Sequence, residues 1–240
     1  MKIESLKLKN FRNYELLSLE FDKATNIFYG DNAQGKTNIL EAVYLSGTTK
    51  SHRGAKDKDL IRFEQNESHI ETVVEKNGIN YQIDMHLKKN SPKGIAINKM
   101  PIRKASELFG IVNIVFFSPE DLNIIKNGPG ERRRFVDLEL SQLDKVYLSN
   151  LANYNRIVNQ RNHLLKEAAY NSDVLKTLDI WDMQLVHYGN LIIQRRQEFV
   201  EQMNEIISGI HNKLTGGKES IRILYEPSNS YLTLEQALNK

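Results

Sequence analysis

The sequence contains no cysteine and no long run of apolar residues. The absence of cysteine excludes disulfide bonds and thiolate metal sites, and it fits a protein that folds in a reducing compartment. No apolar run is long enough to span a bilayer. The first residues alternate charged and apolar side chains, so they do not form a signal peptide. These absences favour a globular, cytoplasmic protein.

A strong net charge is also lacking. The chain has 33 lysine and arginine residues against 30 aspartate and glutamate residues, which gives +3. This mild excess only faintly indicates a nucleic-acid partner. Hydrophobic residues make up 40% and charged residues 26% of the sequence, an ordinary globular balance. The length of 240 residues allows one large domain or two small ones.

The hydrophobic pattern divides the chain into two regions. Up to about residue 117 the apolar runs are short and have the character of strands. Asn77-Gly78 supplies the positive backbone angles of a tight turn, which predicts a hairpin around it. The predicted strands are residues 3–11, 16–21, 25–30, 69–76, 79–89, 94–102 and 111–117.

From about residue 130 the pattern changes to a helical period. It predicts long helices at about 143–165 and 174–214, joined by a short turn into an antiparallel hairpin. A further strand at 221–227 and a helix at 232–240 follow. We therefore expect three parts: residues 1–128 as part of a nucleotide-binding lobe, 129–216 as a helical lobe, and 217–240 as a return toward the first lobe.

A glycine-rich motif stands between a predicted strand and a predicted helix. Gly30, Gly35, Lys36 and Thr37 match G-x-x-x-x-G-K-[ST] in full, in the strand–loop–helix context that this motif requires. Backbone N–H groups of such a loop and the helix N-terminus bind phosphates, while the lysine reaches the β- and γ-phosphates and the threonine hydroxyl reaches Mg²⁺. The predicted binding residues are Gly30, Asp31, Asn32, Ala33, Gln34, Gly35, Lys36, Thr37 and Asn38, with Thr37 as the Mg²⁺ ligand.

Hydrolysis by a P-loop enzyme also needs an acidic residue at the end of a strand. The nearest candidates are Glu120 and Asp121, but Ser118 and Pro119 separate them from the strand predicted at 111–117. We interpret this segment as a loop near the nucleotide. No catalytic residue is therefore predicted in this sequence.

Three segments carry a family resemblance. They are "NFRNY" (10–14), "GDNAQGKTNILEAVY" (30–44) and "FSPEDLNIIKNGPGERRRFVD" (117–137). In this order they resemble the RecF family of bacterial recombination-repair ATPases, within the ABC-type group of chromosome-maintenance ATPases. The resemblance extends from Lys2 to about Leu224. One departure is Asn127, where the family usually has glycine; asparagine tolerates the left-handed conformation, so we expect the turn to form.

The resemblance implies an α/β fold: an ABC-type ATP-binding lobe with a mixed sheet, and a helical lobe. It implies ATP and Mg²⁺ as cofactors, with ATP sandwiched in a homodimer that hydrolysis resets. It also implies a cytoplasmic, nucleoid-associated role in recombinational and replication-gap repair and the SOS response. The dimer would bind single-strand/double-strand DNA junctions and promote RecA loading with RecO and RecR.

The family's signature motif and acidic Mg²⁺-binding strand are not found in the sequence. We therefore expect the N-terminal portion of a longer protein. The family implies a slow, DNA-stimulated ATPase for the whole protein, and we expect no hydrolysis by this portion alone.

Several basic residues are further candidates. Related ATPases place an arginine such as Arg12 beside the nucleotide phosphates. Arg132, Arg133 and Arg134 begin a helical stretch, where at least one is expected to form a structural ion pair and DNA phosphate is the alternative. A basic loop after the P-loop helix is either a solvated surface or, as the resemblance favours, a non-specific DNA contact. Its residues are Lys50, His52, Arg53, Lys56 and Lys58.

Two alternatives remain open. Another ABC-type chromosome-maintenance ATPase would share the P-loop, but the predicted helices are too short for a long coiled-coil arm. A P-loop kinase would need a substrate lid and an acidic strand end. Neither is evident, and the hairpin-rich first region does not resemble a purely parallel kinase sheet.

Overall fold

The computed structural model describes residues 1–227 and residue 235. The chain divides into two compact units, Met1–Arg132 and Arg133–Lys240, called here the first unit and the helical unit. The predicted last region, residues 217–240, falls within the helical unit. The helix predicted at 232–240 lies outside the described residues, apart from Glu235.

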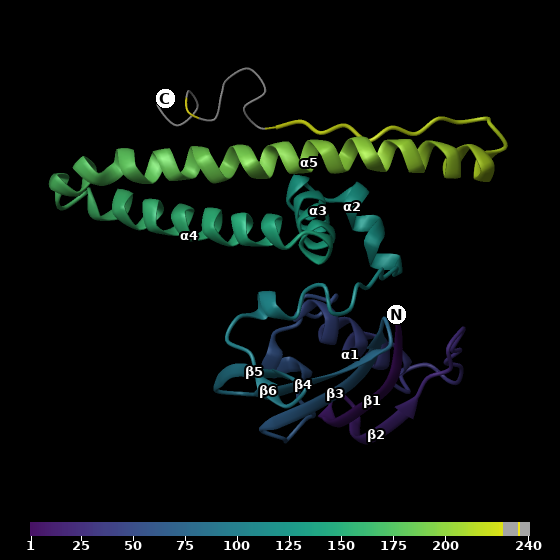
Figure 1. The fold of residues 1–240 in the computed structure, drawn as a ribbon. Coiled ribbons are helices and arrows are strands. Elements are labelled where there is room, and N and C mark those ends of the chain that lie inside the picture. The colour runs from purple at the N-terminus through teal and green to yellow at the C-terminus, as the bar shows by residue number, and fades with distance from the viewer. Residues whose placement is uncertain (228–234, 236–240) are drawn as a thin grey trace. The chain divides into compact units, whose positions relative to one another are not determined.

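The first unit consists of a sheet, one long helix and several short helical turns (Figure 1). Its strands are β1 (Lys2–Phe11), β2 (Tyr14–Glu20), β3 (Glu67–Lys76), β4 (Ile79–Lys88), β5 (Ser91–Ile97) and β6 (Met100–Pro101). Its helices are α1 (Lys36–Thr48), η1 (Asp57–Leu60), η2 (Ala105–Glu107), η3 (Pro119–Leu122) and α2 (Asn123–Lys126).

The sheet has the strand order β2-β1-β3-β4-β5-β6, and every named pair is antiparallel. The hairpin predicted around Asn77-Gly78 is confirmed, because Lys76 pairs with Ile79 and both turn residues have positive φ, 54° and 80°. The resemblance implied a mixed sheet, which contains parallel as well as antiparallel strand pairs. Among the described residues the only parallel pairing is an isolated bridge between Phe109 and Val112.

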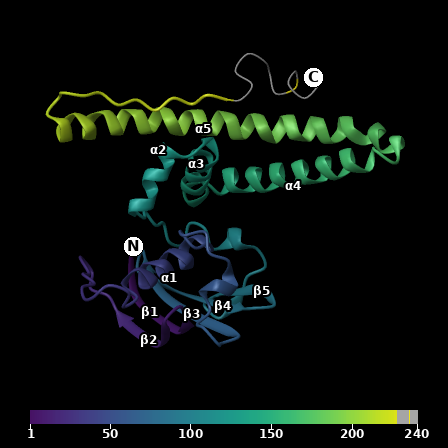
Figure 2. The ribbon, with the colours of Figure 1, turned by 180° about the vertical axis from the view of Figure 1, so that it is seen from behind.

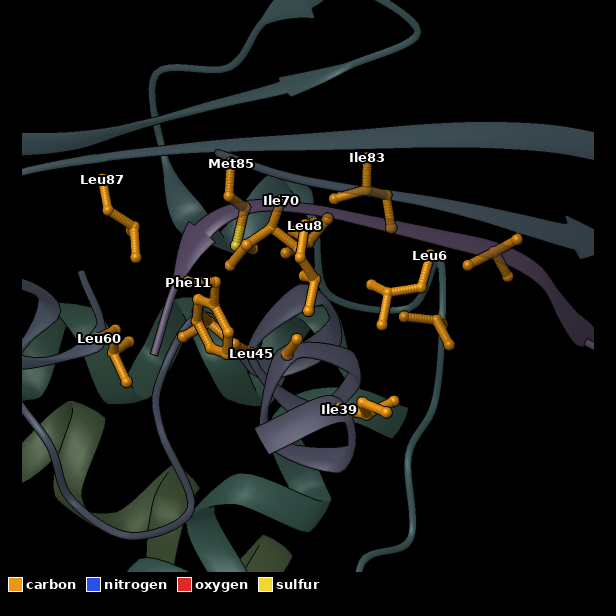
Figure 3. Close-up of a cluster of buried hydrophobic side chains, with 14 of the residues drawn as sticks. Leu6, Leu8, Phe11, Ile39, Leu45, Leu60, Ile70, Ile83, Met85 and Leu87 are labelled. Carbon is orange, nitrogen blue, oxygen red and sulfur yellow. The ribbon is translucent and has the colours of Figure 1, made fainter. Parts of the chain in front are cut away.

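The core of the first unit lies between the sheet and α1 (Figure 3). Alternation along β1 sends Leu6 and Leu8 inward and Lys7 outward, where Lys7 pairs with Glu71 at 2.9 Å. The inward side chains of β3 and β4 meet Leu45 of α1. The labelled members of this buried cluster are Leu6, Leu8, Phe11, Ile39, Leu45, Leu60, Ile70, Ile83, Met85 and Leu87.

Two predicted strands of the first unit do not form. Residues 25–30 and 111–117 contain apolar side chains, yet Ile27 is 78% and Val115 is 92% exposed. A strand needs a hydrogen-bonded neighbour as well as apolar residues. Within the described residues no segment forms a ladder with either of them. The predictions of strands here are therefore wrong for the described structure.

The helical unit contains most of α3 (Pro129–Leu143), followed by α4 (Lys145–Glu167), η4 (Ser172–Thr177) and α5 (Leu178–Thr215). The predicted antiparallel helix hairpin is confirmed, since α4 and α5 run side by side in both views (Figures 1 and 2). Ion pairs fix their register: Arg161 contacts Asp182 at 2.5 Å, and Arg195 contacts Asp144 at 3.0 Å.

The segment after α5 also differs from its prediction. Residues 221–227 were expected as a strand, but they form no ladder. The side chain of Asn204 instead donates to the backbone oxygen of Ile223 and accepts from its N–H, both at 2.8 Å. An amide side chain thus takes the place of a neighbouring strand at this residue.

The arginines at the start of α3 make no ion pair among the described residues. Arg132 donates to the carbonyl oxygens of Ile124 and Asn127, both at 3.0 Å, so its charge lies at the C-terminal end of α2. Asp137, a candidate partner, pairs with Arg196 instead. The expected ion pair is therefore not formed within the part of the chain that the structure describes. None of the described helices combines the length and hydropathy needed to cross a bilayer.

Candidate nucleotide-binding site

The loop between residues 30 and 37, called here the phosphate loop, has the backbone that a phosphate cradle requires. Gly30, Ala33 and Gly35 have positive φ values of 137°, 64° and 96°. Helix α1 begins within the loop at Lys36. The N–H groups of Asn38 and Ile39 donate to the Gly35 carbonyl oxygen, whereas those of Lys36 and Thr37 have no acceptor within the helix. This arrangement offers backbone donors and the positive end of a helix dipole to an anion.

Gly35 is needed for two reasons. Its φ of 96° disfavours any side chain, and a Cβ there would lie 2.7 Å from side-chain atoms of Asn13 and Tyr14. These two residues hold the loop, because the Asn13 amide and the Tyr14 hydroxyl both donate to the Gln34 carbonyl oxygen at 3.3 Å. Asn38 in turn donates to Asn13 at 2.8 Å. The turn after β1 therefore supports the phosphate loop from outside.

Lys36 bends over the loop. Its ammonium group donates to the carbonyl oxygens of Gly30 at 2.7 Å and Asp31 at 2.5 Å. A phosphate oxygen at the same place would accept a stronger, charge-assisted bond. Asn32 and Thr37 are exposed on the loop and the first turn of α1. The role of Asn32 stays a prediction.

Arg12 does not point freely into solvent. Its Nε and one terminal nitrogen donate to the two carboxylate oxygens of Glu41, each at 2.8 Å, and the other terminal nitrogen donates to the Asp59 carbonyl oxygen at 2.9 Å. Glu41 lies on α1 and is completely buried. Burial alone would raise the pKa of Glu41, but hydrogen bonds from Arg12 and Ser51 and the charges of Arg12 and Arg53 lower it below the usual value.

The residues of the predicted basic loop lie in different surroundings. Arg53 donates to Asn38 at 3.2 Å and lies 3.8 Å from Glu41, so it belongs to the neighbourhood of the phosphate loop. His52 packs its ring against Phe116 with centroids 4.2 Å apart. The three remaining residues, Lys50, Lys56 and Lys58, are exposed. DNA contact by this loop stays a prediction.

An open cleft adjoins the phosphate loop. Its volume is about 850 Å³, and its lining includes Arg12, Asn13, Asn38 and Arg53. Phe63, which also lines it, is 87% exposed. A nucleotide whose phosphates occupied the loop would have space in this cleft for its sugar and base. The Phe63 ring could stack on the base.

No convincing acid for hydrolysis lies among the described residues near the loop. Asp121 accepts a hydrogen bond from the backbone N–H of Ser118 at 2.6 Å, so it closes the turn after residue 117. The position of this segment near a nucleotide stays a prediction. The described residues contain no cluster of three or more histidine or acidic side chains suited to a metal. Mg²⁺ fits only as the companion of nucleotide phosphates, where Thr37 would supply one hydroxyl ligand.

Comparison with known proteins gives one consistent result. The family model described as "AAA ATPase domain" matches residues 1–236. "DNA replication and repair protein RecF" of Agathobacter rectalis is 65% identical over the whole chain, and its counterpart in Lachnoclostridium phytofermentans is 57% identical, with 67% of its length covered. The chain belongs to the RecF family.

Solved RecF structures show the same fold. The structure described as "recombination mediator protein RecF-ATP in RecFOR pathway" superposes with a TM-score of 0.90 at 31% identity, covering 99% of this chain and 66% of that one. A second RecF structure, with ATPrS, has a TM-score of 0.83 at 33% identity and covers 90% and 58%. The predicted fold class, an ABC-type ATPase lobe with a helical lobe, is confirmed.

The chain spans about two thirds of the length of the curated RecF proteins that it matches: 66%, 63% and 67% for three of them.

The structure also adds residues that motif reasoning missed. Asn13 and Tyr14 stand in the "NFRNY" segment but were not predicted as site residues, and Ser51 and Glu41 were not singled out. A signal existed for Glu41 alone: it is an acid placed among apolar residues, on the same side of α1 as buried Leu45.

Proposed function

We propose that this chain is the ATP-binding part of a RecF-type DNA replication and repair ATPase, with MgATP bound through the phosphate loop. The observation that carries the proposal is the loop itself. Its left-handed residues, its helix and its outside support from Asn13 and Tyr14 are all in place. The similarity to a RecF structure described with ATP agrees with it.

Each part of the site has a distinct task in this proposal. The N–H groups of the loop and of α1 bind phosphate oxygens, and Lys36 exchanges the two carbonyl oxygens for phosphate. Thr37 provides a hydroxyl ligand for Mg²⁺. The cleft lined by Asn13, Arg53 and Phe63 receives the nucleoside.

The functions of the whole protein are proposed from the family. They comprise slow DNA-stimulated hydrolysis, ATP-dependent homodimerisation, and action with RecO and RecR on junctions of single- and double-stranded DNA to promote RecA loading. Lys50, Lys56 and Lys58, all exposed, support a salt-dependent contact with the DNA backbone. Hydrolysis is assigned to the whole protein, since the described residues offer no acid for it.

Calorimetric titration with MgATP and MgADP tests the nucleotide site. The Lys36→Ala variant should lose most of the binding, because it lacks the ammonium group that contacts the β- and γ-phosphates. Lys23→Ala removes the same charge from the turn after β2 and should bind like the wild type. Equal binding by Lys36→Ala and the wild type would contradict the proposed site.

DNA binding is tested separately. Affinity for a gapped duplex should fall steeply with salt. Replacing Lys50, Lys56 and Lys58 by alanine should make the slope of log affinity against log salt concentration shallower. The slope should fall by about one for each DNA phosphate that a lysine no longer neutralises. An unchanged slope in the triple variant would remove this loop from the DNA interface.

A further inference from the structure

Glu41 is a buried carboxylate at a place where a helix would ordinarily carry an apolar residue. It is 0% exposed, yet it faces two guanidinium groups and a hydroxyl. Ser51 donates to its Oε1 at 2.5 Å, and the same serine oxygen accepts the backbone N–H of Arg53 at 3.1 Å. One side chain thus connects the turn after β1, helix α1 and the loop after α1.

Both arginines keep donors available. A guanidinium has five N–H groups, and Arg12 uses one on each of its three nitrogens, so two remain. Arg53 is held by only one terminal nitrogen, and its side chain is 38% exposed. Its partner Asn38 follows Thr37 in the first turn of α1. Arg12, Asn38 and Arg53 all line the cleft, and Asn38 lies in the helical turn that follows the phosphate loop.

We propose that Glu41 is a positioning residue for the nucleotide: its carboxylate holds Arg12 and Arg53 so that their remaining N–H groups face bound phosphates. This inference rests on the proposed ATP site and adds a residue that does not itself touch the nucleotide. It also explains why an ion is buried in α1, since a pair without a function could be replaced by apolar packing at little cost in stability.

The sign of one measurement separates positioning from simple charge. Glu41→Gln removes a negative charge close to the phosphates, so Coulomb attraction alone would make the variant bind MgATP more tightly. Loss of positioning has the opposite effect, because freed guanidinium groups must be ordered again when ATP binds. We expect MgATP binding to weaken about tenfold, the size of one charge-assisted hydrogen bond.

A matched control comes from the same helix. Ser46 is also buried on α1 and contacts Thr72 of β3 at 2.7 Å, but it touches neither arginine. Ser46→Ala should lower stability and leave ATP affinity unchanged. If both variants weaken binding equally, Glu41 acts only through the general stability of the helix, and the inference fails.

A double-mutant cycle tests the route of the effect. In a background carrying Arg12→Ala and Arg53→Ala, Glu41→Gln should no longer weaken MgATP binding, because no guanidinium remains to be positioned. A tenfold loss that persists in this background would overturn the inference.

Two further results keep the test decisive. If Glu41→Gln does not fold, Ser51→Ala removes one hydrogen bond to the carboxylate and should weaken binding about threefold, whereas unchanged binding would contradict the inference. If wild-type protein binds no MgATP, the proposed function fails first. If wild type binds and Glu41→Gln binds as well or better, only the positioning role is wrong.

Discussion

Each unit of the molecule contains a carboxylate paired with arginine, but the surroundings differ. In the first unit Glu41 lies on α1, the helix that follows the phosphate loop, and the buried cluster of this unit includes residues of β1, β3, β4 and α1. In the helical unit Asp137 accepts from Arg196 at 2.6 Å and from the Tyr147 hydroxyl at 2.5 Å. Among the described residues the buried apolar cluster next to this pair consists of Leu140, Tyr147 and Ile192, with partly buried side chains packed around it. The buried apolar cluster is larger in the first unit, so we expect the polar network to contribute a larger share of the stability in the helical unit.

The exposure of the arginines differs as well. Arg53 beside Glu41 is 38% exposed at the cleft, while Arg196 is only 14% exposed. Nε of Arg196 donates to both Asp137 and Tyr147, and one terminal nitrogen donates to Asp137. The same ion pair chemistry therefore adjoins the proposed nucleotide site in one unit and connects helices in the other. Four predictions test this difference, and the single tryptophan, Trp181 of α5, reports the helical unit separately.

The largest effect is expected from the apolar core of the first unit. Leu45→Ala should destabilise that unit by about 2 to 5 kcal/mol, since the leucine is fully buried between α1 and the sheet. Urea unfolding followed by circular dichroism should show an earlier transition for the first unit. Trp181 fluorescence should keep its midpoint, and a parallel shift of both signals would mean that the two units unfold together.

The polar network should give the next largest effect. Asp137→Asn should cost the helical unit about 2 kcal/mol, because Arg196 and Tyr147 lose the charged acceptor that they share. The midpoint of Trp181 fluorescence in urea measures it. Asp173→Asn provides the control: its pair with Lys176 is exposed on both sides and should leave the midpoint unchanged. MgATP affinity should not change in either variant.

Tyr147→Phe sharpens the comparison further. Burial raises the pKa of Tyr147, and the hydrogen bond to Asp137 adds to it, so the hydroxyl stays protonated and donates at neutral pH. Phenylalanine keeps the ring but removes that bond, which should cost about 1 kcal/mol while the Arg196–Asp137 pair persists. A loss as large as that of Asp137→Asn would show that the tyrosine, not the ion pair, holds the three helices together.

Local patterns predicted the elements that depend on neighbours in sequence. The hairpin at Asn77-Gly78 and the pairing of α4 with α5 follow from turn chemistry and a helical period, and both formed as expected. The strands expected at 25–30 and 111–117 did not form, because an apolar run contains no information on whether a second strand lies beside it. Strand formation there depends on distant partners.

The candidate site shows the same limit. The phosphate loop was predictable because its motif is contiguous, and its glycines and lysine have fixed tasks. Asn13 and Ser51 reach it from segments distant in sequence, and only the folded chain brings them to Gln34 and Glu41. The basic loop could not be resolved either, since charge alone does not tell that Arg53 contacts Asn38 and lies near Glu41 while Lys56 makes no such contact.

The smallest effect on stability is expected from the charge of Glu41, and it should depend on pH. Its pKa in the folded protein lies below the ordinary glutamate value of 4.5, so it contributes stability above that pH and loses it as the pH falls through the lowered value. Wild type should therefore be more stable than Glu41→Gln at pH 7, and the difference should shrink below pH 4.5. Urea unfolding of the first unit at several pH values measures it. A difference that stays constant under acid would mean that the charge of Glu41 contributes nothing to holding Arg12, and the contrast with Asp137 would then lie only in burial.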